Sequence, residues 1–211
     1  MLNLLILGAG GHGKVVADVA TQTRKWDKIS FLDDNLELYK VNGIEVIGKL
    51  SDYFLHTQKY QHAFVAIGDG KVRLKWIEIL NEAGFNIPSL IHPFSSVSKY
   101  SQISFGTLVN AGVVVNTNVE IGTGCILNTN CSVDHDSILQ DGVHLSPGVK
   151  VSGSVLVGRR SWICVGSTIS NNIEIGSDVI VAAGAVVINS IPDNVMVAGV
   201  PAIIKKKLGV E

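Results

Sequence analysis

The 211-residue chain has few charged residues, and the two signs nearly balance. Lys and Arg together number 17, Asp and Glu number 18, and the formal net charge is −1. A chain this close to neutrality has no overall electrostatic attraction to nucleic acid or to an anionic membrane surface. The composition therefore predicts neither as a partner.

Cysteines and long apolar runs are scarce as well. Cys125, Cys131 and Cys164 include no C-x-x-C pair and do not form a disulfide framework, which predicts a protein of the reducing cytoplasm. The apolar stretch Leu2–Leu7 is too short to span a bilayer and has no basic residues before it. We interpret it as a buried first strand rather than a signal peptide.

What the chain has in abundance is a six-residue repeat. Every sixth residue from Val97 to Val187 is Val, Ile or Leu, without exception. Three residues after most of these comes Gly, Asn or Asp, as at Gly106 and Asn118, and four residues after comes a mostly small or β-branched residue, as at Thr107. Neither the two-residue period of an amphipathic strand nor the 3.6-residue period of a helix fits this spacing.

Each column of the repeat has a physical reason. The aliphatic and small residues point inward and stack on their counterparts in the next coil, which buries a continuous core. Gly, Asn and Asp tolerate the left-handed backbone needed at the bend between two flat faces. Three hexads complete one triangular coil. The repeat therefore predicts an all-β left-handed parallel β-helix within residues 93–211, with a little over five coils.

The residues before the repeat follow a different pattern. Short apolar runs typical of strands, Leu4–Leu7, Ile29–Leu32 and Ala63–Ile67, alternate with segments in which the apolar residues have helical spacing. Asp69 stands where it can cap the second of these helices. The pattern predicts a small α/β domain of the Rossmann-like βαβ type over residues 1–92.

A glycine-rich motif follows the first predicted strand. Residues 8–13 read GAGGHG, a G-x-G-x-x-G pattern in which glycines let a phosphate approach the backbone at a helix N-terminus. Asp33 ends the second strand, where an acidic side chain commonly binds a ribose. A tight turn without a ligand would give the same pattern. A nicotinamide dehydrogenase would need a second nucleotide-binding half, so a nucleotide-linked sugar fits better.

Two histidines lie within the repeat, and His135 is the candidate for catalysis. It occupies a corner of the predicted coil and is followed by Asp136. An exposed imidazole with an acidic neighbour can act as a general base. Gly153 lies one coil above, and its missing side chain predicts an opening where a slim ligand could lie. A merely solvated corner histidine is the alternative interpretation.

The second histidine of the repeat, His144, lies half a coil further on and therefore faces a different side of the predicted prism. If both histidines serve one site, they come from different subunits, which favours a symmetric oligomer. Trp162 lies one coil above His144. Packing at a subunit interface is therefore as consistent with this position as contact with a ligand.

Taken together, these motifs resemble those of one family. They are similar to the sugar O-/N-acyltransferases of the sialic acid O-acetyltransferase type, and among them most similar to the UDP-4-amino-sugar N-acetyltransferase of the bacillosamine pathway. The resemblance covers nearly the whole chain. It rests on the hexapeptide repeats and on residues 7–13, Asp33-Asp34, residues 66–69 with Arg73, Ile91-His92-Pro93, Asn128-Thr129, His135-Asp136 and residues 199–202.

The resemblance implies a homotrimeric acetyl-CoA-dependent N-acetyltransferase that acts without a metal. The acceptor would be the 4-amino group of a nucleotide-linked sugar, and His135 would be the base, assisted by Asp136. Asp136 stands where that relative carries Glu, one methylene longer, so the geometry of this assistance is open. The implied acceptor-binding residues are Gly10, Gly11, His12, Asp33, Asp34, Gly68, Arg73 and Asn128. The implied acetyl-CoA-binding residues are His144, Gly153, Gly166, Gly184, Pro201 and Lys205.

Other functions stay open at this point. A sialic acid or other sugar O-acetyltransferase, a GDP-linked amino-sugar N-acetyltransferase and a non-catalytic nucleotide-sugar-binding module all use the same motifs. A zinc enzyme on this fold would need three converging histidines, and the repeat has two. A sugar nucleotidyltransferase would need a far larger N-terminal domain. The lysines at 205–207 either meet the 3′-phosphate of CoA or form a solvated basic tail.

Overall fold

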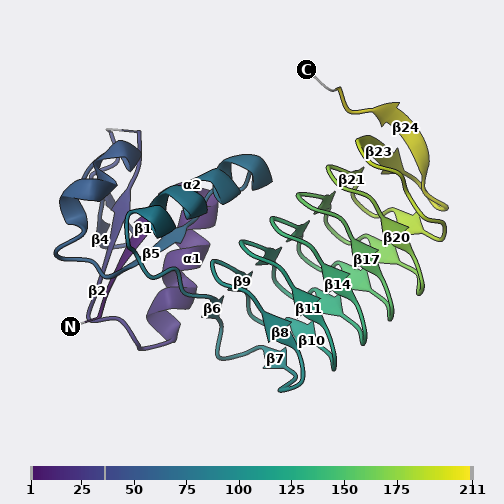
Figure 1. Ribbon diagram of the computed structural model, residues 1–211, viewed down its shortest axis with the longest axis horizontal. Helices are drawn as coiled ribbons and strands as arrows, with labels where there is room; N and C mark the ends of the chain where they lie inside the picture. The colour runs from purple at the N-terminus through teal and green to yellow at the C-terminus, as the bar shows by residue number, and fades with distance from the viewer. Residues whose placement is uncertain (1, 36, 210–211) are drawn as a thin grey trace. The chain divides into compact units, whose positions relative to one another are not determined.

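The computed structural model describes residues 2–35 and 37–209. The chain divides into two compact units, one ending at Pro93 and the other beginning at Phe94 (Figure 1). The first unit is α/β and the second is all-β, as predicted. Within the described residues, no helix combines the length and the apolar character that crossing a membrane would require.

The first unit is built on a small parallel sheet with strand order β2-β1-β5. Short elements fill the connection between β2 and β5, among them the antiparallel pair β3 and β4. The elements are β1 (Asn3–Leu7), α1 (Gly11–Gln22), β2 (Lys28–Leu32), β3 (Lys40–Val41), β4 (Ile44–Glu45), the 3₁₀-helix η1 (Leu50–His56), β5 (His62–Val65), α2 (Gly70–Glu82) and β6 (Leu90–Ile91).

The predicted helices and strands of this unit are confirmed. The strand residues Leu4–Leu7 are fully buried, and α1 buries Val16 and Val19 on one face. Asp69 caps α2 by accepting a hydrogen bond from the Val72 amide at 2.8 Å. Strand β5 ends at Val65, two residues before the end of its apolar run, because the chain turns there into the loop before α2.

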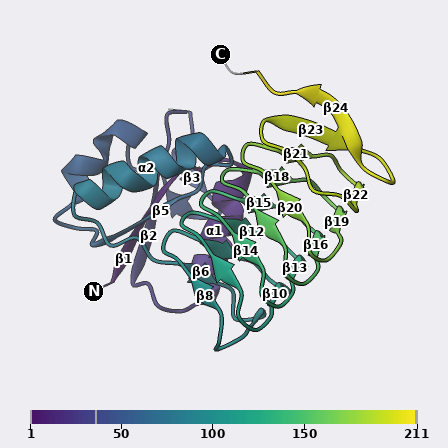
Figure 2. The same cartoon turned by 45° about the vertical axis from the view of Figure 1, so that its right-hand side comes forward.

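The second unit is a stack of two-residue strands, each ending on a residue of the predicted aliphatic column (Figure 2). Two longer strands follow, β23 (Val195–Ala198) and β24 (Ile203–Lys207). The short strands are β7 (Ser96–Val97), β8 (Gln102–Ile103), β9 (Leu108–Val109), β10 (Val114–Val115), β11 (Glu120–Ile121), β12 (Ile126–Leu127), β13 (Ser132–Val133), β14 (Ile138–Leu139), β15 (His144–Leu145), β16 (Lys150–Val151), β17 (Leu156–Val157), β18 (Trp162–Ile163), β19 (Thr168–Ile169), β20 (Glu174–Ile175), β21 (Ile180–Val181) and β22 (Val186–Val187).

These strands form the three faces of a left-handed parallel β-helix. The first face has the order β22-β19-β16-β13-β10-β7, and the second has β20-β17-β14-β11-β8. The third contains β9, β12, β15, β18, β21 and β23 in sequence, with β24 antiparallel to β23. The register pairs residues one coil apart, for example Val115 with Val133. The predicted 18-residue coil is therefore confirmed.

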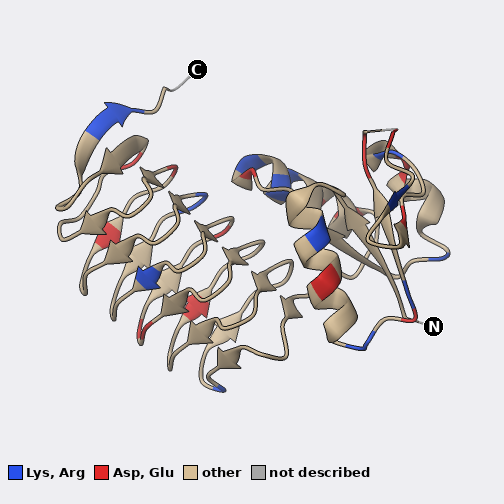
Figure 3. Cartoon of the chain, turned by 180° about the vertical axis from the view of Figure 1, so that it is seen from behind, with Lys and Arg blue, Asp and Glu red and all other residues tan. Residues whose placement is uncertain are grey.

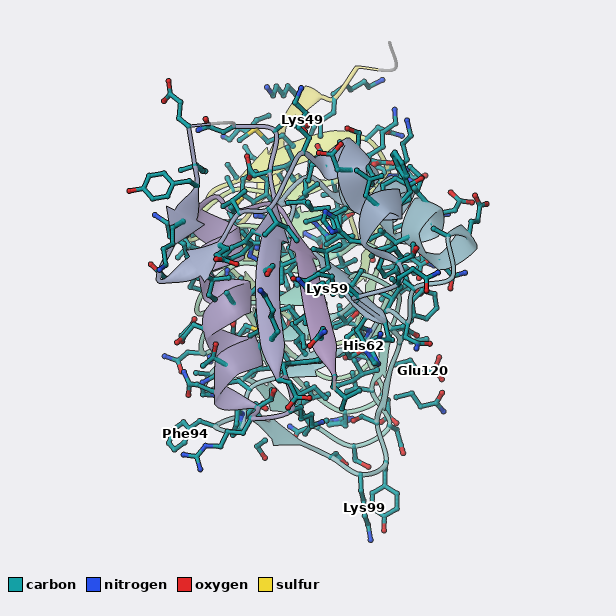
Figure 4. The ribbon with its side chains drawn as sticks, turned by 90° about the vertical axis from the view of Figure 1, so that its left-hand side faces the viewer. Lys49, Lys59, His62, Phe94, Lys99 and Glu120 are labelled. Atoms are coloured by element: carbon teal, nitrogen blue, oxygen red, sulfur yellow. The ribbon has the colours of Figure 1, made fainter. Side chains whose placement is uncertain are left out.

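The inward and corner columns also behave as predicted. The aliphatic column from Val109 to Val187 forms one buried core, with Val97 and Ile103 of the first coil partly buried beside it. Most outward positions between them are exposed or half-buried, as at Glu120, which is labelled in Figure 4. Leu108 and Ile126, on the third face, are outward positions that are buried. Most corners take positive φ, and within the described residues two do so although the residue is not Gly, Asn or Asp: Ser154 with φ 57° and Arg160 with φ 60°.

Buried hydroxyl groups link successive coils inside the prism. The Ser161 Oγ donates to the Gly176 carbonyl at 2.7 Å and accepts from the Val179 amide at 3.0 Å. Ser137 makes the same pair of bonds four hexads earlier, and Thr107 does so in the first coil. These small polar residues satisfy backbone groups that would otherwise be buried without partners.

Candidate active site

His135 lies at the corner between β13 and β14, directly beside Asp136. Its Nδ1 donates to the Asp136 Oδ2 at 2.8 Å, and the two side chains are 53% and 52% exposed. Asp136 has φ 58°, the left-handed corner conformation, which turns its carboxylate back toward the ring. The aspartate thus reaches the imidazole despite its short side chain.

The charges around His135 favour its protonated form. The hydrogen bond that Nδ1 donates to Asp136 raises the pKa of the imidazole, and the negative charge of Asp134 acts in the same direction. The same hydrogen bond holds the pKa of Asp136 below its usual value, so this carboxyl is ionised at neutral pH. With Nδ1 donating to Asp136, Nε2 of the neutral ring carries the lone pair. That is the arrangement of a general base.

Gly153, one coil above, provides the space in which the imidazole lies. A Cβ at Gly153 would stand 2.6 Å from both Cε1 and Nε2 of His135, closer than any side chain can approach. The predicted opening for a slim ligand is wrong at this point, because the ring of His135 itself fills the space that the missing side chain of Gly153 leaves. The assignment of Gly153 to acetyl-CoA binding remains a prediction, and the structure gives it a second role.

Three polar residues that the sequence analysis did not single out hold this pair. The Asn118 amide donates to the Asp136 Oδ1 at 3.2 Å, and the Asn116 amide donates to the Asp134 Oδ1 at 2.8 Å. Asp134 in turn accepts the His135 backbone amide at 2.8 Å. Each asparagine lies 18 residues before its aspartate, so the coil length read from the sequence was the signal that would have found them.

His144 lies on a different face of the prism from the His135 corner, as predicted, because it belongs to β15. Its ring stacks on Trp162 with 5.7 Å between centroids and an interplanar angle of 6°. The Trp162 Nε1 donates to the Ser146 Oγ at 2.8 Å, which fixes the indole plane. Within one chain, His135 and His144 therefore belong to separate surfaces.

Several residues assigned to substrates lie along another corner, between the third face and the first. Asn128 follows β12 there and accepts from the Asn110 amide at 3.0 Å. Gly166 and Gly184 occupy the same corner in later coils, both with φ +68° and no neighbouring atom within 4 Å of a Cβ built on them. With Gly148, in the same column, they leave an open strip without side chains.

Pro201 and Lys205 lie beyond the last coil. Pro201 is exposed in the turn between β23 and β24, and Lys205 is exposed on β24 together with Lys206 and Lys207. These lysines form the basic strand coloured blue near the C-terminus in Figure 3. The strand is a cationic surface at the end of the prism.

In the first unit the glycines of the motif divide into two kinds. Gly8 and Gly13 serve packing: a Cβ on Gly13 would lie 2.1 Å from the Gly8 carbonyl oxygen, and Gly8 has φ +101°. Gly10, Gly11 and Gly68 have no atom within 4 Å of such a Cβ. These last three are the ones assigned to acceptor binding, and they border open space.

His12 sits at the start of α1 with its ring largely enclosed. Among the described residues, its Nε2 is buried and has no hydrogen-bond partner. Burial first, and then the positive charge of Arg73, lowers the pKa of His12 to about 4. The ring is therefore neutral at pH 7, with a buried polar atom left for a ligand or a water molecule.

Arg73 is almost fully buried, with 1% of its surface exposed. Its guanidinium donates to the carbonyls of Ile67 and Gly68 at 2.8 and 2.7 Å. Arg73 thus fixes the loop between β5 and α2 from the inside. Its direct contact with an acceptor remains a prediction.

Asp33 connects two of the predicted motifs. Its Oδ2 accepts from the Ala9 amide at 2.6 Å, and its Oδ1 accepts from the Asn35 amide at 2.8 Å. Asp34 is exposed and accepts from the Leu50 amide at 3.0 Å. Asp33 therefore links the glycine loop after β1 to the loop after β2. Both loops follow the carboxyl ends of parallel strands, where nucleotides bind in folds of this kind.

The residues that the structure describes contain no group of three or more His, Cys, Asp or Glu side chains arranged to hold a metal ion.

Comparisons with known proteins show the family of the chain. Residues 3–80 match the PglD N-terminal domain family. A variant of perosamine N-acetyltransferase from Caulobacter crescentus, solved with CoA and GDP-perosamine, is 35% identical over 97% of each chain, with a TM-score of 0.92. The acetyltransferase domain of PglB from Neisseria gonorrhoeae FA1090, solved with acetyl coenzyme A, is 39% identical over 96% of this chain and 98% of its own, with a TM-score of 0.93. The chain belongs to the PglD-like family of sugar acyltransferases.

A curated relative is consistent with membership of the PglD-like family. The putative lipopolysaccharide biosynthesis O-acetyl transferase WbbJ of Escherichia coli K12 is 45% identical over 56 residues. That match covers 26% of this chain and 29% of WbbJ, so the chain spans less than a third of this relative.

Proposed function

We propose that the protein transfers an acetyl group from acetyl-CoA to the 4-amino group of a sugar carried by a nucleoside diphosphate, with UDP as the nucleotide. The observation that carries the chemistry is the His135–Asp136 pair, in which a 2.8 Å hydrogen bond from Nδ1 leaves the lone pair on Nε2 of a half-exposed ring. Perosamine N-acetyltransferase has also been solved with one histidine replaced, by asparagine in one variant and by alanine in another.

The proposed reaction is a direct transfer. The sugar amine attacks the thioester carbonyl while Nε2 of His135 accepts the ammonium proton. The tetrahedral adduct then expels the CoA thiolate, which takes that proton back from the imidazolium to leave as a thiol. Asp136 holds the ring in the correct tautomer and stabilises the imidazolium.

The donor would lie along the glycine corner of the prism. Gly166 and Gly184 present bare backbone there, which suits an extended pantetheine arm. The exposed lysine strand containing Lys205 suits the phosphates of CoA. Pro201 and the stacked pair of His144 and Trp162 complete the proposed donor surface.

The acceptor nucleotide would bind to the first unit. Gly10, Gly11 and Gly68 border open space, and the buried Nε2 of His12 has no hydrogen-bond partner within the described part of the chain. Asp33 and Asp34 supply carboxylates for the ribose or the base. Asn128 would contact the sugar.

The identity of the substrate is tested by assaying a panel of nucleotide sugars for release of free CoA thiol. We expect turnover with a UDP-linked 4-amino sugar and none with its 4-hydroxy counterpart. A GDP-linked 4-amino sugar belongs in the panel because GDP-perosamine is bound in the Caulobacter structure. Turnover only with hydroxyl acceptors would replace the proposal with an O-acetyltransferase, and binding without turnover would indicate a binding module.

The role of the first unit is tested separately by Asp33→Ala. The change removes the acceptor for the Ala9 amide and a carboxylate from the nucleotide surface. KM for the nucleotide sugar should rise at least tenfold while KM for acetyl-CoA stays within twofold. Equal increases in both would contradict the assignment of this unit to the acceptor.

We further propose that the enzyme is a homotrimer in the cytoplasm, where its three cysteines remain free thiols. His135 and His144 lie on separate surfaces of one chain, so one site that uses both needs two subunits. Light scattering at assay concentration should give three times the chain mass of 22.5 kDa. A fully active monomer would rule out the shared site.

A further inference from the structure

We propose that Asn118, one coil before the His135–Asp136 pair, is a positioning residue that keeps the Asp136 carboxylate turned toward His135. This inference rests on the proposed role of His135 as the base. The 18-residue coil places Asn118 next to Asp136 in the stack, but the spacing alone does not show that their side chains bond. Its amide nevertheless donates to the Asp136 Oδ1 at 3.2 Å while Oδ2 of the same carboxylate accepts from the imidazole.

The backbone explains why the two side chains meet. Asn118 and Asp136 both have φ 58° and stand in the same corner column, one coil apart. Identical backbone conformation at an 18-residue spacing projects their side chains in parallel, so that an amide nitrogen reaches a carboxylate oxygen. The same column continues with Ser154 at φ 57° and Asn172 at φ 58°.

The contact matters because Asp136 is exposed. A half-exposed aspartate is free to exchange rotamers, and in other rotamers its carboxylate leaves the imidazole for solvent. Each oxygen has one protein donor, Asn118 on Oδ1 and His135 on Oδ2. Losing the first donor would release the carboxylate to rotate, and the Nδ1–H tautomer of His135 would no longer be fixed.

A second asparagine supports the backbone of the same corner. Asn116 donates to the Asp134 Oδ1, and that oxygen also accepts the His135 amide. Asp134 and Asp136 are the charged side chains that act on the His135 imidazole, and Gly153 leaves the space that the ring occupies. Each of the two aspartates is thus tied to an asparagine of the preceding coil.

The test compares Asn118→Gly with Asn172→Gly. Glycine accepts the positive φ at both positions, so each change removes an amide without straining the corner. We expect Asn118→Gly to lower kcat about 3- to 10-fold, the range for one lost hydrogen bond, with both KM values within twofold. Asn172→Gly should leave kcat unchanged. Asn118→Asp, which has the same shape but cannot donate at neutral pH, should fail to restore kcat.

Two further measurements separate this inference from the proposed function. In an Asp136→Asn background, Asn118→Gly should cause no additional loss, because it acts only through Asp136. NMR titration of the His135 ring needs no substrate, and it should show a lower pKa in Asn118→Gly than in the parent or in Asn172→Gly. An unchanged His135 pKa, or wild-type kcat in Asn118→Asp, would overturn the positioning role. A parent enzyme that transfers no acetyl group while the pKa still shifts would overturn only the proposed function.

Discussion

At the scale of single residues, three neighbours determine where the imidazole of His135 lies. Asp136 binds its Nδ1, Asp134 accepts its backbone amide, and Gly153 leaves room for the ring. The sequence identified His135, Asp136 and Gly153 because their spacing places them at one corner. It did not indicate that the ring lies on the glycine, since spacing gives the direction of a side chain but not its rotamer.

The first prediction concerns Gly153→Ala. The new Cβ would stand 2.6 Å from two atoms of the His135 ring, so the imidazole must move off the corner. A base displaced by about 1 Å is expected to lose on the order of 10- to 100-fold in kcat. The matched control is Asn171→Ala, one coil above in the same column, which should keep full activity. Equal activity of the two variants, measured by CoA release, would show that catalysis does not depend on the position of the ring against Gly153.

The second prediction concerns pH. The base acts in its neutral form, and the raised pKa of His135 therefore places the acidic limb of the kcat/KM profile above pH 6.5. Asp136→Asn removes the main cause of that raised pKa, so the limb should move to lower pH. The plateau should also fall, because the amide no longer stabilises the imidazolium. If the acidic limb does not move, the group that titrates in the profile is not His135.

At the scale of elements, the β-helix was predictable almost residue by residue, because one period dictates burial, bend and register together. The corner at Arg160 departs from the residue pattern. Arg160 adopts the left-handed corner conformation without the usual small or amide side chain, and it pairs with Asp178 one coil on through two hydrogen bonds. The hydrogen bonds between coils were not predicted, because they depend on side-chain orientation across 18 residues.

The third prediction tests those inter-coil bonds through Ser161→Ala. The change leaves the Gly176 carbonyl and the Val179 amide without their buried partner. The expected cost is about 1–3 kcal/mol in the free energy of unfolding, measured in urea at one fixed protein concentration. Thr168→Ala, on an outward position, should cost little. An unchanged free energy of unfolding in Ser161→Ala would mean that the buried hydroxyl groups do not stabilise the prism.

At the scale of the whole molecule, the proposed nucleotide site lies in one unit and the proposed base in the other. The α/β unit carries the open glycines, the neutral His12 and the Asp33-Asp34 pair. The β-helix carries the His135–Asp136 pair. The sequence predicted both folds and both sets of residues, the latter largely through the family resemblance. Burial of Arg73 and the hydrogen bond from Asn118 emerged only from the structure, because both depend on how side chains are oriented, and sequence spacing gives position without orientation.

The most direct test of the central claim is the kcat of His135→Ala with acetyl-CoA and a nucleotide-linked 4-amino sugar, followed by CoA release. Loss of a general base typically costs about 10²- to 10⁴-fold. We expect a loss in this range, with both KM values changed little, because the histidine acts on charge that develops only along the reaction. The fold should survive, since His135 lies outside the inward column. A folded His135→Ala protein that turns over within a few-fold of the parent would contradict the account.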